Sequence, residues 1–150
     1  MSLQDKVMTE MKAAMRAKDS TRLEALRAVK SAILLAQTDA AGKDGLNEEE
    51  ELKLLQKLVK QRKESAAIYK EQGREDLAGP ELEQAAVIEQ FLPKQMSEEE
   101  IEKEVEDIIS KTGATGMQNM GKVMGMASKE LAGKADGKTI SVVVKRKLGS

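Results

Sequence analysis

Gly116–Leu148 reads GMQNMGKVMGMASKELAGKADGKTISVVVKRKL, and the last third of this stretch decides between an all-helical and a mixed fold. Thr139–Val144 is β-branched at nearly every position, a composition that favours a strand. The apolar residues from Ile140 to Leu148 also fit helical spacing. Because a lone strand would have no partner and the rest of the chain reads as helix, we expect a helix here and an all-α fold.

The chain before this element predicts two more helices, which complete a C-terminal three-helix module. Ser97–Glu100 has the serine-to-glutamate spacing of a capping box, and Gly113 ends the helix that comes after it. Thr115 and Gln118 have a similar spacing at the start of the next helix, which we expect to end at Gly133.

Two features of this next helix have structural interpretations. Met117, Met120 and Met124 form a stripe that we interpret as core, with an adaptable binding surface as the alternative. Gly121 and Gly125 stand four residues apart, a spacing that permits close approach of another helix.

The N-terminal part of the chain predicts four helices. Ser2 and Asn47 are suited to cap the first and third of them. After a turn at residues 74–77, Pro80 is expected at the first position of the fourth helix, and Pro93 stops it. The expected ranges are residues 2–17, 19–38, 47–72 and 80–92.

These patterns divide the chain into two modules. An N-terminal helical module covers residues 1–93, residues 94–96 form a linker, and the three-helix module covers residues 97–150. Within the first module, residues 39–45 are rich in Gly and Asp and are expected as a loop.

The composition excludes several kinds of chemistry. The chain has no Cys and no His. A thiolate nucleophile, a Cys/His zinc site and histidine acid–base catalysis are therefore excluded. No phosphate-cradling GxxxxGK[ST] or GxGxxG sequence occurs. A Mg²⁺ site at Glu102 and Glu106 is disfavoured against a solvated helix face. We expect no cofactor, no metal and no autonomous enzyme activity.

The hydropathy pattern indicates no membrane segment. No apolar run approaches the ~20 residues of a membrane span. The N-terminus also lacks the apolar region of a signal peptide. We therefore expect a cytoplasmic protein.

The bases of the C-terminal module are the candidate binding groups. The net charge is −1, but residues 97–110 carry seven acids and one base, whereas residues 111–150 carry eight bases and two acids. A surface that gathers such bases neutralises phosphates without reading sequence, and the scarcity of aromatic residues argues against base stacking. The candidates are Lys122, Lys129, Lys134, Lys138, Lys145, Arg146 and Lys147, with Arg62, Lys63 and Arg74 as secondary contacts.

Three stretches together resemble the GatB/YqeY family. They are Val59–Ser65 (VKQRKES) with Tyr69 and residues 73–77 (GREDL), Glu89–Gln95 (EQFLPKQ), and Met120–Met124 (MGKVM) with Lys134–Lys138 (KADGK). The similarity extends over nearly the whole chain, and the combination is specific.

The resemblance implies an all-helical, two-part protein whose C-terminal part is similar to the tail domain of the GatB subunit of tRNA-dependent amidotransferases. That tail is understood to help engage tRNA, and the amidation chemistry sits in other domains that this chain does not match. Met126–Ser128 departs from the relatives, which tend to have Leu-Met-Pro there. The positions that match the tail motif are Gly121, Lys122, Lys134, Gly137 and Lys138.

Together these observations point to a non-catalytic accessory protein that binds tRNA or another structured RNA. One alternative is a helical protein–protein adaptor that works with amidotransferase or translation proteins. Another is a subunit that contributes to carbon–nitrogen ligase activity, with glutamine as amido-N-donor, only within a complex. Arg62 interrupts an apolar stripe, and we favour an ion pair with Glu24 or Glu89 over a ligand contact.

Overall fold

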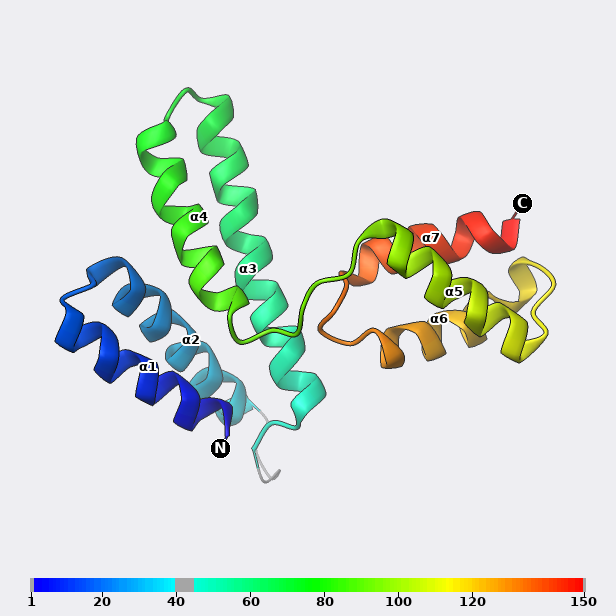
Figure 1. The fold of residues 1–150 in the computed structure, drawn as a ribbon, viewed down its shortest axis with the longest axis horizontal. Helices are drawn as coiled ribbons and strands as arrows, with labels where there is room; N and C mark the ends of the chain where they lie inside the picture. Colours follow the sequence, from blue (N-terminus) through cyan, green and yellow to red (C-terminus); the bar gives the residue numbers. More distant parts are fainter. Residues whose placement is uncertain (1, 40–44, 150) are drawn as a thin grey trace. The chain divides into compact units, whose positions relative to one another are not determined.

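All secondary structure in residues 2–39 and 45–149, which the computed structural model describes, is helical (Figure 1). The all-α prediction is therefore confirmed, and the ambiguous C-terminal stretch is a helix. Most of the predicted loop over residues 39–45 lies outside the described residues. The helices are α1 (Leu3–Ala17), α2 (Ser20–Asp39), α3 (Glu48–Glu71), α4 (Glu75–Glu89), α5 (Glu98–Thr112), the 3-10 helix η1 (Met117–Asn119), α6 (Met120–Glu130) and α7 (Gly137–Gly149).

Contacts group these helices into two units, Met1–Leu92 and Pro93–Ser150. The first unit consists of two helical hairpins, α1–α2 and α3–α4 (Figure 1). The helix α2 packs against α1, α3 and α4 and supplies Leu26 and Ile33 to the shared core. Arg22, also on α2, pairs with Glu10 of α1 and donates from Nη2 to Oε1 of Gln90 at 3.0 Å. The side chain of Arg22 thus links α2 to α1 and to the end of α4 through polar contacts.

The N-terminal ends of α1 and α3 form as the sequence predicts. The Ser2 side chain accepts the N–H of Asp5 at 3.1 Å, and the Asp5 carboxylate accepts the N–H of Ser2. The Asn47 side chain accepts the N–H of Glu50 at 2.8 Å. Each cap satisfies a backbone donor that has no partner inside the helix.

The prediction for α4 was wrong at both ends. The helix begins at Glu75 rather than Pro80, because the Arg74 carbonyl accepts the N–H groups of Leu77 and Ala78 at 3.1 and 3.0 Å. Pro80 therefore lies inside the helix, where a proline removes a hydrogen bond. Ala78 is buried, so packing of the first turn opposes this penalty. At the other end, the helix ends at Glu89, and the chain continues as a turn.

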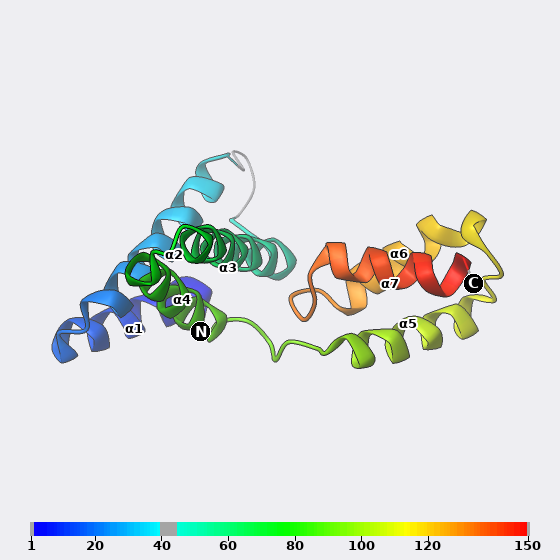
Figure 2. The same cartoon turned by 90° about the horizontal axis from the view of Figure 1, so that it is seen from above.

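The second unit is a three-helix bundle of α5, α6 and α7, and Figure 2 shows α5 running along one side of the α6–α7 pair. Its core contains Val105 and Ile108 of α5, Val123 of α6 and Val143 of α7, all fully buried. A capping box at Ser97 opens α5, and Gly113, with a φ of +68°, ends it in the left-handed conformation. Both ends of α5 are as predicted.

The second predicted capping box, at Thr115, does not form. Gly116 is extended rather than helical, and the Thr115 N–H donates to Oδ1 of Asn119 at 3.1 Å. The chain then enters α6 through η1, and α6 ends at Glu130 rather than at Gly133. Glycine loses much backbone freedom in a helix, so the local hydrogen bond to Asn119 prevails.

Residues 94–96, expected as a linker, are bonded into the second unit. The Met96 N–H donates to the Lys134 carbonyl at 2.9 Å, and the Gln95 side chain donates to the Gly133 carbonyl at 2.7 Å. Met96 also packs against the core of this unit. The turn between α6 and α7 is thereby held to the entry of α5.

Candidate functional site

The outer face of α6 carries two of the predicted binding lysines. Lys122 and Lys129 stand seven residues apart, which places them on one face about 10 Å apart along the helix axis. Both are exposed, whereas Val123 and Ala127 point into the core. Neither lysine has an ion pair with any residue that the structure describes. Their charges are therefore available to a ligand.

The glycines of α6 are exposed on the same side of the helix. A Cβ atom at Gly121 or Gly125 would have no heavy atom of another element within 4 Å among the described residues. The expectation that these glycines permit close packing of another helix is therefore wrong within this structure. They leave helix backbone uncovered at two points near Lys122, at Gly121 directly before it and at Gly125 between Lys122 and Lys129.

A second pair of predicted lysines lies on α7. Lys138 and Lys145 are also seven residues apart, exposed, and without ion pairs in the described part of the chain. Lys134 lies in the turn before α7, with an exposed side chain and a backbone bonded to Leu131 and Met96. The helices α6 and α7 and the turn between them thus carry five exposed lysines that make no ion pair with a described residue.

The Gly137–Lys138 pair does not form an open anion site at the start of α7. Asp136 precedes the helix, and its carboxylate accepts the N–H of Lys138 at 3.4 Å. Its carbonyl accepts the N–H of Ile140 at 3.0 Å. A carboxylate at this position satisfies the positive end of the helix and repels an incoming phosphate.

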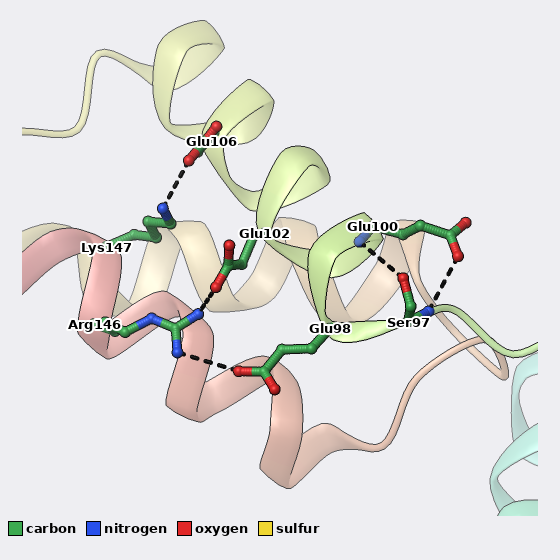
Figure 3. A network of polar contacts seen from close by, with 7 residues as sticks. All are labelled: Ser97, Glu98, Glu100, Glu102, Glu106, Arg146 and Lys147. Atoms are coloured by element: carbon green, nitrogen blue, oxygen red, sulfur yellow. Dashed lines mark hydrogen bonds and ion pairs between the residues drawn. The ribbon is translucent and has the colours of Figure 1, made fainter.

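The remaining two predicted cations, Arg146 and Lys147, are paired with α5 (Figure 3). Arg146 contacts the carboxylates of Glu98, at 3.1 Å from Nη1, and of Glu102. The Lys147 Nζ lies 2.7 Å from Oε1 of Glu106. The acidic run expected as a solvated face therefore supplies partners to α7, and the C-terminal Lys-Arg-Lys run does not act as one free basic patch.

The cap of α5 also holds a perturbed carboxylate (Figure 3). Oε1 of Glu100 accepts the Ser97 N–H at 3.2 Å, and the Ser97 hydroxyl accepts the Glu100 N–H at the same distance. The backbone donor of Ser97, followed by its side chain, lowers the pKa of Glu100 below its ordinary value of 4.5. This carboxylate is thus committed to the helix start.

The secondary candidates Arg62 and Lys63 have structural partners in the first unit. Arg62 donates to Oε1 of Gln84 and to the Leu58 carbonyl, each at 3.1 Å, and it makes no ion pair with a described residue. The expected pairing of Arg62 with Glu24 or Glu89 is therefore wrong. Lys63 makes the contact with Glu89 instead, at 2.6 Å.

Arg74, the third secondary candidate, is also engaged. It binds the carboxylate of Asp76 through two hydrogen bonds, 3.0 Å from Nε to Oδ1 and 2.9 Å from Nη2 to Oδ2. The contact raises the pKa of Arg74 and lowers the pKa of Asp76 below its ordinary value of 3.8. These three cations therefore bind neighbouring residues of the first unit, unlike the five lysines of the second unit that lack an ion pair with a described residue.

Two contacts had not been inferred from the sequence. The side-chain amide of Gln95 fastens the turn at Gly133, and Arg22 joins α1 to the end of α4. No local pattern marks either residue, because each acts on a segment far along the chain. The α5–α7 pairs had a detectable signal, since Glu98, Glu102 and Glu106 recur every four residues and match the charges of the last turn.

Residues 2–39 and 45–149 contain neither a metal-binding cluster nor a membrane-spanning helix. No three or more Asp, Glu, His or Cys side chains among them are arranged to hold a metal ion. No helix in these ranges combines the length and the apolar composition needed to cross a membrane.

Comparison with known proteins gives one family and two relatives. The family model described as Yqey-like protein matches residues 4–148. A glutamyl-tRNA(Gln) amidotransferase subunit of Thermococcus gammatolerans is 38% identical over 73 residues, which cover 46% of this chain and 12% of the relative. The subunit of the same name from Methanococcus maripaludis is 47% identical over 57 residues, or 35% of this chain and 9% of the relative. The match thus covers about a tenth of each relative's length.

Proposed function

Since the chain belongs to the YqeY-like protein family, we propose that it is a non-catalytic accessory protein that binds tRNA or another structured RNA through its second unit. The observation that carries the proposal is that five lysines on α6, on α7 and in the turn between them are exposed and make no ion pair with a described residue. These lysines are Lys122, Lys129, Lys134, Lys138 and Lys145. Phosphate contacts by such lysines supply affinity without sequence specificity. The proposal places the protein in the cytoplasm, where tRNA is used.

The exposed backbone of α6 supports this assignment. The absence of side chains at Gly121 and Gly125 allows a ligand backbone to approach the helix closely beside Lys122. The chain has one Tyr, one Phe and no Trp, so few aromatic side chains are present on which bases could stack. Recognition of RNA by backbone and shape fits this composition better.

The relatives support a connection with amidotransferases. Both are glutamyl-tRNA(Gln) amidotransferase subunits, and the chain matches a small part of each. We propose that amidotransferase or translation proteins are its partners. No thiol or imidazole is available for catalysis by the chain itself, because it has no Cys and no His.

A binding measurement with two matched double variants tests the RNA proposal. Lys122→Gln with Lys129→Gln removes two of the proposed phosphate contacts. We expect weaker binding to bulk tRNA and a slope of log K against log salt that is shallower by about 1.4–1.8. Lys12→Gln with Lys57→Gln removes the same charge from exposed positions of the first unit and should leave the slope unchanged.

Equal slopes for the wild type and the α6 variant would remove α6 from the interface. No binding of the wild type at low salt would refute the RNA proposal and favour the adaptor role.

Charge reversal at the C-terminal run is a poorer test. Glutamates at positions 146 and 147 would face Glu98, Glu102 and Glu106 and disturb the fold itself.

A further inference from the structure

The α5–α7 ion pairs form an ordered row along one side of the second unit. Glu98, Glu102 and Glu106 recur every fourth residue, so their carboxylates lie on one stripe of α5. Figure 3 shows this stripe facing the end of α7, with Arg146 between Glu98 and Glu102, and Lys147 at Glu106. Both cations therefore face carboxylates of the same protein.

The charge balance of this row opposes anion binding. Three carboxylates and two cations leave a net charge of −1 where the sequence alone suggests a basic patch. A phosphate that approaches Arg146 meets two carboxylates already in contact with the guanidinium. Carboxylate and phosphate use the same geometry on this group, so they compete for the same donors.

The row is nevertheless open to exchange. The side chain of Arg146 is 45% exposed and that of Glu98 is 61% exposed. Ion pairs of this exposure are individually weak and are screened by salt. A polyanion with several phosphates can therefore displace carboxylates that a single phosphate cannot.

We propose that the acidic stripe of α5 masks Arg146 and Lys147 and so competes internally with RNA. This inference rests on the proposed function of the second unit and adds regulation to it. The five free lysines set the binding strength of the resting protein. Neutralisation or displacement of the stripe adds two cations to the same small unit, which raises affinity and salt sensitivity together.

A triple variant exposes the masked cations without touching them. Glu98→Gln, Glu102→Gln and Glu106→Gln remove the charges of the stripe and keep similar side-chain volumes. The matched control is Glu99→Gln, Glu104→Gln and Glu130→Gln. These three exposed acids of the same unit have no ion pair with a described residue. Both variants change the net charge by the same amount, so their difference reports unmasking alone.

The measurement is binding to bulk tRNA over a range of salt concentrations. Two added phosphate contacts should make the slope of log K against log salt steeper by about 1.4–1.8 in the unmasked variant relative to the control. Arg146→Gln with Lys147→Gln, added to the unmasked variant, should remove that increase. Circular dichroism checks folding, and if the triple variant is unfolded, Glu106→Gln alone should give about half the change by freeing Lys147.

The outcomes separate this inference from the proposed function. Equal slopes for the unmasked and control variants would overturn masking even if the wild type binds tRNA. Binding by the unmasked variant alone would support masking and refute RNA binding by the resting protein. Absence of binding in every variant would overturn both, because the freed cations would then have no affinity for a polyanion.

Discussion

At the scale of single residues, capping side chains explain why some sequence signals succeed and others fail. Ser97 and Glu100 form the box that their spacing predicts, whereas Thr115 and Gln118 do not. The difference lies in the residues directly after the cap, since Gly116 adopts an extended conformation and Asn119 offers a competing acceptor. The spacing of a capping box is therefore predictive only where the next residue favours a helix.

The cap of α5 gives a stability prediction. Ser97→Ala removes the acceptor of the Glu100 N–H and should lower the free energy of unfolding by about 1 kcal/mol. Urea denaturation measures the change. Ser110→Ala, at an exposed position inside the same helix, is the control and should not lower stability, because Ala has a higher helix propensity than Ser. Equal losses in the two variants would contradict the role of the cap.

The same cap predicts a pH dependence. Because the pKa of Glu100 is lower in the folded protein than its ordinary value of 4.5, its contribution to stability is present above that pH. The contribution is lost as the pH falls through the folded-state pKa. Carboxyl chemical shifts measured by NMR should place this pKa below 4.5, and Ser97→Ala should raise it. A value at or above 4.5 in the wild type would contradict the hydrogen bonds of the cap.

At the scale of elements, helical periodicity located every α-helix of the described residues, and most errors concern helix ends. Proline is common at a helix start, so Pro80 was expected there. The helix α4 begins five residues earlier, where the Arg74 carbonyl and a buried first turn stabilise it. For Thr139–Val144, the apolar spacing outweighed the β-branched composition because the helix α7 buries its apolar face in the bundle. Tertiary packing decides both cases, and it is absent from a local sequence window.

The exposed glycine in the middle of α6 gives a prediction at this scale. Gly125→Ala places a methyl group in open space on a helix and should raise the free energy of unfolding by up to about 1 kcal/mol. Thermal denaturation measures this change. Gly133→Ala is the opposite case and should lower stability, because Gly133 has a φ of +76°, which strains any residue with a side chain. Loss of stability in Gly125→Ala would mean that this face is packed rather than open.

At the scale of the whole molecule, the sequence located the charges but not their partners. The free lysines on α6 and α7 could be found from residue order and helical spacing. The pairing of Arg146 with Glu98 joins residues 48 positions apart, so it depends on how α5 packs against α7. For the same reason the partner of Arg62 was assigned wrongly and the contact of Lys63 with Glu89 was not inferred, since both depend on the register of α3 against α4.

The salt dependence of wild-type binding to bulk tRNA is the decisive measurement for RNA binding by the second unit. If the five free lysines each neutralise a phosphate, log K should fall linearly with log salt, with a slope of about −3.5 to −4.5. A slope in this range, together with a shallower slope for the variant Lys122→Gln with Lys129→Gln, would identify the lysines of the second unit as phosphate contacts. A slope near zero, or no binding at low salt, would contradict RNA binding by this protein.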